Sequence, residues 1–239
     1  QPDGAEAMIR VVFNQKGGVG KSTIAVNLAA IAAERGARVL LVDLDSQANA
    51  SQYLLGAGVA DATPTAADFF DGMLSFKLSR EPIDTYIHRT PFEHLDVLPA
   101  SPALAELQGK LEARSKILKL REALRSLAKE YEQIYIDTPP ALNFYTRSAL
   151  IAADGCLIPF DCDDFSRQAV YGLLDATAEI RADHNAALRI EGIVVNQFQS
   201  RASQPARVVR VLRNMSVVCS VQACSAIERM RRISGKGVM

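Results

Sequence analysis

The stretch Lys16-Gly17-Gly18-Val19-Gly20-Lys21-Ser22-Thr23 decides the fold. An apolar run over residues 9–13 precedes it, and a helical pattern over residues 22–35 follows it. Strand, glycine-rich turn and helix form the usual context of a phosphate-binding loop, because glycines let backbone N–H groups point at phosphate oxygens. The helix N-terminus adds partial positive charge. We therefore predict that nucleotide phosphates are bound by Gly17, Gly18, Val19, Gly20, Lys21, Ser22 and Thr23.

Two side chains of this loop have defined chemistry. Lys21 can reach the terminal phosphates, and the Ser22 hydroxyl can ligate Mg²⁺, which prefers oxygen ligands. The usual loop is G-x-x-x-x-G-K-[ST], whose first glycine would fall at Gln15, and the next residue, Lys16, adds a second lysine. Two lysines on one tight turn repel each other unless an anion binds, which argues against a turn without a ligand.

A dinucleotide fingerprint, G-x-G-x-x-G, is the rival interpretation of the loop. Gly18 and Gly20 fit it, but Thr23 stands at the third glycine position. That interpretation also leaves Lys21 and Ser22 unexplained, so we favour the phosphate-binding loop.

The composition is typical of one α/β domain with a substantial core. The chain has 239 residues, 49% of them hydrophobic and 23% charged, with a formal net charge of zero. No apolar run reaches the roughly 18–20 residues of a membrane-spanning helix, and no secretory signal pattern opens the chain. The four cysteines show no C-x-x-C spacing, so we predict free thiols. We interpret residues 1–7 as an expression remnant or a disordered segment, and residues 8–239 as a single domain.

Two aspartates follow a predicted buried strand. The apolar run over residues 39–42 is typical of a strand buried on both faces, and it ends in Asp43-Leu44-Asp45. Carboxylates at the carboxyl end of a strand beside a phosphate loop belong to the ligand crevice of such folds. If the strand continues, Asp43 and Asp45 point the same way. We predict that Asp45 orients the attacking water and that Asp43 supports the loop or the outer metal shell; a plain capping turn is the alternative.

A second apolar strand ends in another aspartate. Residues 133–136 lead into Asp137, which is followed by Thr138-Pro139-Pro140. This pattern fits a Walker B element, in which Asp137 holds Mg²⁺ through water because Mg²⁺ dehydrates reluctantly. The two prolines stiffen the following segment, which is placed to act as a switch that senses the γ-phosphate.

Strand and helix signals alternate along the chain. This predicts an α/β fold, specifically a P-loop NTPase with a mostly parallel, twisted sheet and helices on both faces. Asn196 lies at the carboxyl end of a predicted strand, where its amide is a candidate for reading the base; turn capping is the alternative. Further helices are expected from Ala66 to about Gly72, over residues 102–112 and 116–131, and further strands over residues 83–88, 95–98, 155–160, 190–196 and 217–218.

Basic residues are concentrated in the C-terminal part of the sequence. From Gly192 to Met239 there are eight basic residues and one acid, Glu228. This asymmetry indicates a polyanion or an acidic surface as partner, with a solvated basic face as the alternative. The basic residues are Arg201, Arg207, Arg210, Arg213, Arg229, Arg231, Arg232 and Lys236.

Together, these motifs resemble the signatures of the ParA/MinD family of deviant Walker A ATPases, in order and in spacing. No helix-turn-helix extension precedes the loop, so the resemblance is to ParA-type partition ATPases without that domain. The resemblance implies a slow, partner-stimulated ATPase that uses ATP and Mg²⁺. It also implies an ATP-dependent sandwich homodimer that binds DNA without sequence preference and distributes a plasmid, chromosome or protein cargo with a ParB-type partner. The motifs that carry it are residues 16–23, 42–49, 98–101 and 136–140.

The resemblance also implies roles for single residues. Lys16 is similar to the lysine that reaches the phosphates of the partner subunit, and Lys21 to the phosphate-binding lysine within one subunit. Ser22 and Asp137 correspond to the Mg²⁺ ligand and the Walker B acid, and Asp45 to the residue that places the attacking water. The basic C-terminal region would bind DNA through phosphate contacts, which give affinity without sequence readout. For these contacts we select Arg201, Arg229 and Arg231.

A MinD-like, membrane-associated positioning ATPase is the alternative function. It requires a C-terminal amphipathic helix with bulky apolar residues on one face. This sequence offers Ile227, Met230, Ile233 and Val238, interrupted by glycines, so we expect no stable membrane association. The expected location is cytoplasmic and nucleoid-associated. A small-molecule kinase or ligase, or an iron–sulfur carrier relative, is a third interpretation.

Overall fold

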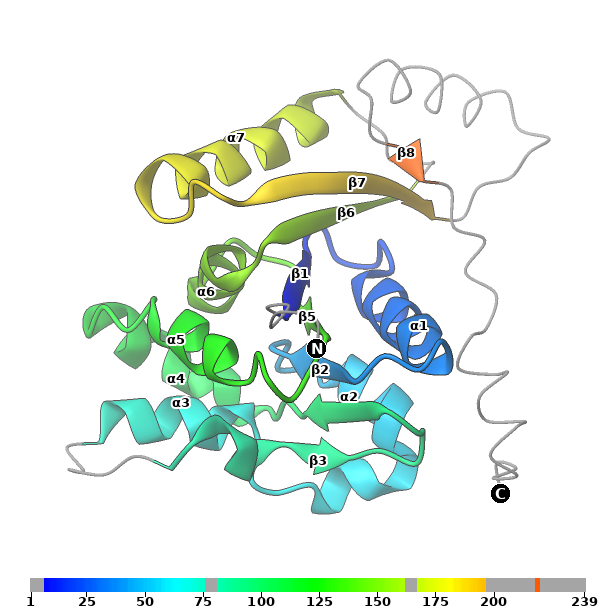
Figure 1. Cartoon of the computed structure of the whole chain (residues 1–239). Coiled ribbons are helices and arrows are strands. Elements are labelled where there is room, and N and C mark those ends of the chain that lie inside the picture. Colours follow the sequence, from blue (N-terminus) through cyan, green and yellow to red (C-terminus); the bar gives the residue numbers. More distant parts are fainter. Residues whose placement is uncertain (1–6, 76–80, 162–166, 197–217, 220–239) are drawn as a thin grey trace.

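The fold is a twisted α/β sheet with helices on both faces, as predicted (Figure 1). The computed structural model describes residues 7–75, 81–161, 167–196 and 218–219. Within them, the strands form one sheet in the order β3-β4-β2-β5-β1-β6-β7-β8, in which only β3 is antiparallel to its neighbour. The strands are β1 (Met8–Val12), β2 (Val39–Asp43), β3 (His88–Arg89), β4 (Leu95–Leu98), β5 (Gln133–Asp137), β6 (Gly155–Asp161), β7 (Arg189–Asn196) and β8 (Val218–Cys219).

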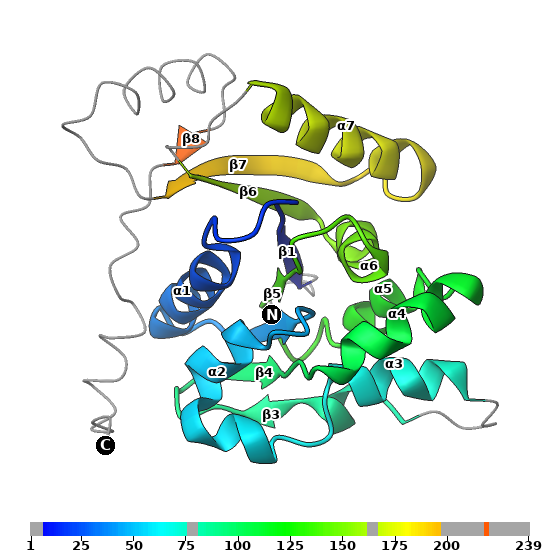
Figure 2. The same ribbon diagram turned by 180° about the vertical axis from the view of Figure 1, so that it is seen from behind.

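The helices divide between the two faces of the sheet. Helices α1 and α2 cover one face, and α3 to α7 cover the other, as the views from the front and from behind show (Figures 1 and 2). Each face has its own core cluster. The helices are α1 (Lys21–Glu34), α2 (Asn49–Leu55), α3 (Ala66–Leu74), α4 (Ala103–Ala113), α5 (Lys119–Ser126), α6 (Phe144–Ala152) and α7 (Arg167–Asp183), with 3₁₀ turns η1 (Gly56–Asp61) and η2 (Ile83–Tyr86).

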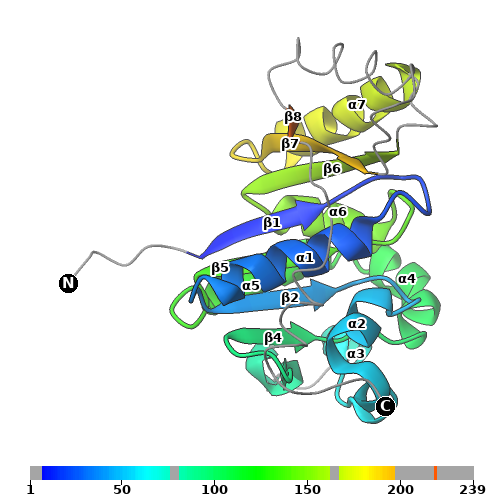
Figure 3. The ribbon, with the colours of Figure 1, turned by 90° about the vertical axis from the view of Figure 1, so that its right-hand side faces the viewer.

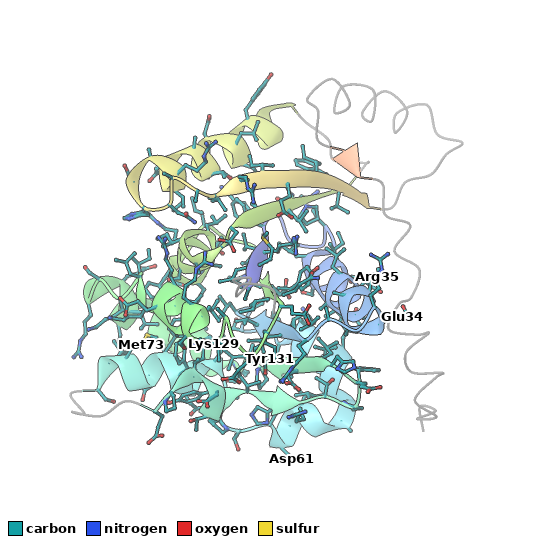
Figure 4. The ribbon with its side chains drawn as sticks, in the orientation of Figure 1. Glu34, Arg35, Asp61, Met73, Lys129 and Tyr131 are labelled. Carbon is teal, nitrogen blue, oxygen red and sulfur yellow. The ribbon has the colours of Figure 1, made fainter. Side chains whose placement is uncertain are left out.

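The central strands are buried on both sides, which explains their continuous apolar sequences. Every residue of β2 is buried, and its run of valine and leucine contributes to the core cluster of α1 on one face and to the core cluster of α3 to α7 on the other. Helix α1 is rich in alanine, which lets it lie close to the sheet. Its C-terminal residues Glu34 and Arg35 project at the edge of the molecule (Figure 4).

The carboxyl ends of the parallel strands meet at one edge of the sheet (Figure 3). The loop from β1 to α1 crosses this edge, next to the loops that follow β2 and β5. In parallel sheets with helices on both faces, this edge is where ligands bind. At the opposite edge, Ala7 precedes β1 and is buried in the core. The packed domain therefore includes Ala7, which the sequence analysis assigned to the N-terminal segment of residues 1–7.

Three predicted elements differ from those in the structure. Residues 83–88 do not form one strand: a 3₁₀ turn, η2, precedes the two-residue strand β3. Gly72 does not end α3. The helix begins at a Thr65–Asp68 capping box and continues to Leu74, and its last turn buries Met73 in the core. The helix predicted over residues 116–131 is shorter in the structure, where α5 spans Lys119–Ser126. The apolar residues Leu127 and Tyr131 lie beyond the helix and are still buried.

Candidate nucleotide-binding site

The loop between β1 and α1 depends on glycine at defined positions. Gly18 and Gly20 have φ angles of 78° and 87°, in the left-handed region that side chains with a Cβ rarely adopt. Gly20 is the residue from which α1 begins, without a side-chain cap. The first backbone N–H groups of the helix therefore point into the loop, which is the arrangement that binds phosphate.

Lys21 folds back into the loop rather than out into solvent. It is 7% exposed, and its Nζ donates a hydrogen bond to the main-chain oxygen of Lys16 at 2.7 Å. Burial lowers the pKa of Lys21, while the nearby carboxylates of Asp137 and Asp45 raise it. The predicted phosphate-binding lysine and the two predicted acids are thus close enough to interact electrostatically.

Asp137 is a buried carboxylate at the end of β5. It is 0% exposed, and neither of its oxygens has a hydrogen-bond partner among the described residues. Burial raises its pKa well above the usual range, and the charge of Asp43 adds to this shift; the Ser22 hydroxyl and the Lys21 ammonium oppose it. A buried carboxylate with two unused oxygens is costly unless a cation or a ligand satisfies it.

The residues at this position fit a magnesium site that is completed by a nucleotide. Asp137 supplies two buried oxygens and Ser22 a hydroxyl, and both are the hard oxygen ligands that Mg²⁺ prefers. In the part of the chain that the structure describes, no three His, Cys, Asp or Glu side chains are grouped to hold a metal ion by themselves. Mg²⁺ is commonly held by one or two protein ligands together with substrate phosphates and water, which matches this donor set.

Asp43 holds the turn at Asp45 and the start of α2. Its Oδ2 accepts hydrogen bonds from the Ser51 amide at 2.9 Å and the Ser51 hydroxyl at 2.7 Å, and its Oδ1 accepts one from the Asp45 amide at 3.1 Å. The Ser51 hydroxyl in turn accepts a hydrogen bond from the Ala100 amide at 2.9 Å. Burial raises the pKa of Asp43 to about 6, although these hydrogen bonds lower it. These contacts hold Asp45 and the start of α2, and the two predicted roles of Asp43, support of the phosphate loop and of the outer metal shell, stay predictions.

Asp45 lies on a turn and not on a continued strand. Strand β2 ends at Asp43, so the condition under which both aspartates would point the same way is not met. Asp45 Oδ1 accepts a hydrogen bond from the Gln47 amide at 3.0 Å, as a turn-capping aspartate would. Its charge nevertheless acts on both Lys21 and Asp137, which places it at the site.

Lys16 differs from Lys21 in being exposed. Its backbone is fixed: the Lys16 amide donates to Asn14 Oδ1 at 2.9 Å, and the Lys16 carbonyl accepts from Lys21. The adjacent Gly17 lies beside the proline segment after β5, because a Cβ at this position would stand 3.8 Å from Pro140 Cβ. The phosphate loop and the proposed switch segment are therefore neighbours.

The other predicted contacts are placed only in part. Asn196 is the last residue of β7, at the same edge of the sheet as the phosphate loop, and its backbone pairs with Asp161 of β6. Thr23 lies in the first turn of α1, where its carbonyl accepts a hydrogen bond from the Asn27 side chain at 2.7 Å. Three predicted DNA contacts lie outside the described residues: Arg201, Arg229 and Arg231.

Sequence reasoning missed two residues that hold the backbone around this site, Asn14 and Ser51. Each is a buried polar side chain that joins segments far apart in the chain. Asn14 was visible as a polar residue at the end of an apolar run, directly before the loop. Ser51 carried no local signal, since its partners are Asp43 and the Ala100 amide 49 residues away.

Known proteins are similar to this chain in sequence and in fold. The AAA_31 family, described as an AAA domain, matches residues 7–190. The chain is 38% identical over 203 residues to the chromosome partitioning protein ParA of Myxococcus xanthus, covering 84% of this chain and 69% of that protein. It is 39% identical over 204 residues to the chromosome-partitioning ATPase Soj of Thermus thermophilus, covering 84% and 73%.

A solved structure with a bound nucleotide is also similar. It is the cobyrinic acid a,c-diamide synthase from Mycobacterium smegmatis with a bound ATP analogue and magnesium. It superposes with a TM-score of 0.78 at 27% identity, covering 87% of this chain and 82% of that chain.

Proposed function

The chain belongs to the AAA_31 family of AAA domains, with ParA and Soj partition ATPases among its relatives, and on that premise we propose that it is a partition or positioning ATPase. It hydrolyses ATP to ADP and phosphate with Mg²⁺, slowly until a partner stimulates it. The observation that carries this proposal is that the buried Lys21 lies close to the buried Asp137 at the carboxyl edge of the sheet, and that the Asp137 oxygens have no hydrogen-bond partner among the described residues.

The residues of the site divide the work of phosphoryl transfer. Backbone amides from Gly17 to Thr23 and the Lys21 ammonium neutralise phosphate charge. Ser22 and Asp137 would hold Mg²⁺, which would offset the negative charge of the phosphate oxygens. Asp45 positions the attacking water; its Oδ1 accepts from the Gln47 amide, and the carboxylate has further lone pairs that can accept from the water.

Lys16, the second lysine of the loop, would make the proposed site one that two subunits share. Lys16 is exposed, whereas Lys21 occupies the interior of its own loop. An exposed cation beside a phosphate site can neutralise the phosphates of a second copy of the chain, and only ATP presents a γ-phosphate there. We therefore expect a sandwich homodimer that assembles with ATP and separates after hydrolysis.

The proposed partners of the ATP-bound dimer are non-specific DNA and a ParB-like adaptor or cargo protein. The basic C-terminal region suggests DNA binding through phosphate contacts, with nucleoid association as the result. The relatives' names support the partition role, because ParA of Myxococcus xanthus and Soj of Thermus thermophilus are both chromosome-partitioning proteins.

Sedimentation with DNA or with anionic liposomes tests this function against the MinD-like alternative. Among the described residues, no helix is long and apolar enough to cross a membrane. With ATP and Mg²⁺ present, we expect the wild-type protein to sediment with DNA at low salt and to be released as salt rises. Binding to liposomes without binding to DNA would overturn the proposal in favour of the membrane-associated ATPase. The Lys21→Ala variant serves as the control that cannot respond to ATP.

A further inference from the structure

Asn14 joins the start of the phosphate loop to strand β6. It is 4% exposed and directly follows the last apolar residue of the β1 segment. Its Nδ2 donates a hydrogen bond to the carbonyl of Pro159 at 2.7 Å, and its Oδ1 accepts one from the Lys16 amide at 2.9 Å. One side chain therefore joins the start of the loop to the backbone of Pro159, 145 residues from Asn14 in sequence.

The Asn14 side chain takes the place of the next backbone hydrogen bond between β1 and β6. The Phe13 amide donates to the Leu157 carbonyl at 2.9 Å, continuing the parallel ladder beyond β1. In such a ladder, alternate residues bond to alternate carbonyls, so the next donor to the Pro159 carbonyl would be the Gln15 amide. The side-chain Nδ2 of Asn14 donates to the Pro159 carbonyl instead. The backbone can thus leave the strand at Gln15 while the buried carbonyl keeps its partner.

The other end of the same side chain shapes the first turn of the loop. An asparagine that accepts a hydrogen bond from the amide two residues later forms an Asx turn, which fixes the direction of the chain. Here that amide belongs to Lys16, whose carbonyl accepts the hydrogen bond from Lys21. The Lys16 backbone is therefore held on both sides, by Asn14 at its N–H and by Lys21 at its C=O.

We propose that Asn14 is a positioning residue for Lys16: it sets the direction in which the exposed lysine leaves the loop toward the second subunit of the ATP dimer. The proposal deepens the proposed function and rests on it, because it assumes that Lys16 acts across the dimer. A side chain anchored to β6 holds Lys16 in place even when Lys21 turns from the Lys16 carbonyl to bind phosphate. The geometry of the second lysine is then set before the partner arrives.

Two variants at position 14 test this role. Asn14→Ala removes both hydrogen bonds. Asn14→Asp has nearly the same shape and keeps the acceptor for the Lys16 amide, but it replaces the donor to Pro159 by an oxygen. Asn185→Ala is the matched control, because Asn185 is also a buried asparagine that donates to main-chain carbonyls, between α7 and β7 and away from the loop.

Each variant is measured for ATP affinity of the monomer, with a fluorescent ATP analogue, and for ATP-dependent dimer formation, by light scattering. We expect both Asn14 variants to bind the nucleotide within about threefold of wild type and to lose dimer affinity by about tenfold or more, as expected for a lost buried hydrogen bond. Asn185→Ala lowers thermal stability and leaves dimer affinity at the wild-type value.

A double-mutant cycle with Lys16→Ala separates positioning from general damage to the fold. If Asn14 acts through Lys16, the Lys16→Ala/Asn14→Asp double variant dimerises no worse than Lys16→Ala alone. Additive losses, or wild-type dimerisation of both Asn14 variants beside a defective Lys16→Ala, overturn the positioning role and leave the proposed function standing. Normal dimerisation of Lys16→Ala itself overturns the proposed cross-subunit function, and the positioning role with it.

Discussion

The Nζ of Lys21 donates a hydrogen bond to the main-chain oxygen of Lys16 at 2.7 Å, so the two lysines of the loop are joined through the backbone of one and the side chain of the other. Burial lowers the pKa of Lys21, and the nearby carboxylates offset this only in part. A phosphate group that enters the loop offers Lys21 a charged partner in place of a neutral carbonyl, and charge-assisted hydrogen bonds are the stronger ones. Nucleotide binding is therefore expected to release the Lys16 carbonyl.

Replacing Lys21 by alanine is expected to weaken ATP binding by about two orders of magnitude and to abolish hydrolysis, because the loop loses its buried cation. Binding of a fluorescent ATP analogue and phosphate release measure the two effects. Lys129→Ala, at an exposed lysine after α5, is the control that keeps both activities. Normal turnover of Lys21→Ala would refute the assignment of the loop.

Replacing Asp45 by asparagine separates hydrolysis from assembly. Asparagine keeps an oxygen for the Gln47 amide, so the turn is retained, but it cannot take a proton from water. We expect phosphate release to fall by about a hundredfold or more, while the ATP-bound dimer accumulates. Size-exclusion chromatography with ATP detects the trapped dimer. Hydrolysis at the wild-type rate would remove Asp45 from the mechanism.

Replacing Asp137 by asparagine is expected to stabilise the nucleotide-free protein while abolishing ATP hydrolysis. The raised pKa of Asp137 means that the folded protein binds this proton more tightly than the unfolded chain does. Its ionisation therefore lowers the free energy of unfolding, and this loss is absent below the unfolded-state pKa near 3.8 and grows as the pH rises above it. We predict a gain of about 1–3 kcal/mol at pH 8 for Asp137→Asn, and little at pH 4.

Thermal unfolding in EDTA, as a function of pH, measures this effect, and each kcal/mol raises Tm by roughly 2–4 °C in a domain of this size. Asp61→Asn, at an exposed aspartate, is the control and should leave Tm unchanged at both pH values. A loss of stability at pH 8 for Asp137→Asn would contradict the view that the carboxylate lacks partners until a cation and a nucleotide bind.

Replacing Ser51 by alanine is expected to cost about 2–3 kcal/mol of unfolding free energy. The change removes one donor from the buried carboxylate of Asp43 and leaves the Ala100 amide without its acceptor. Urea denaturation measures the loss. Ser126→Ala, at an exposed serine, is the control. A loss below about 0.5 kcal/mol, the usual range for surface substitutions, would show that these hydrogen bonds contribute little.

The sequence was sufficient to predict the fold class, because the patterns that carry it are local. The strand, glycine turn and helix around Gly20 are local, and so are the apolar runs of the buried strands. Because the carboxyl ends of parallel strands meet at one edge, the sequence also predicts that Asp43 and Asp137 lie at the same edge of the sheet; they are paired residues of β2 and β5.

The features that sequence reasoning did not predict depend on contacts between distant segments. Strand β2 ends at Asp43, whose carboxylate accepts hydrogen bonds from the Ser51 side chain and amide and from the Asp45 amide. The role of Asn14 depends on a carbonyl of β6. The sequence of residues 83–88 resembles a short strand, yet Ile83 and Tyr86 lie in a 3₁₀ turn that buries both side chains.

ATP-dependent dimerisation of Lys16→Ala tests the central claim most directly. Light scattering in the presence of a slowly hydrolysed ATP analogue and Mg²⁺ gives the dimer fraction, and a fluorescent analogue gives the affinity of the monomer for nucleotide. We predict that Lys16→Ala binds the nucleotide within about threefold of wild type, since Lys21 and the loop amides remain, and that it stays monomeric at concentrations at which the wild type is dimeric. A Lys16→Ala protein that dimerises with ATP as the wild type does would contradict the account.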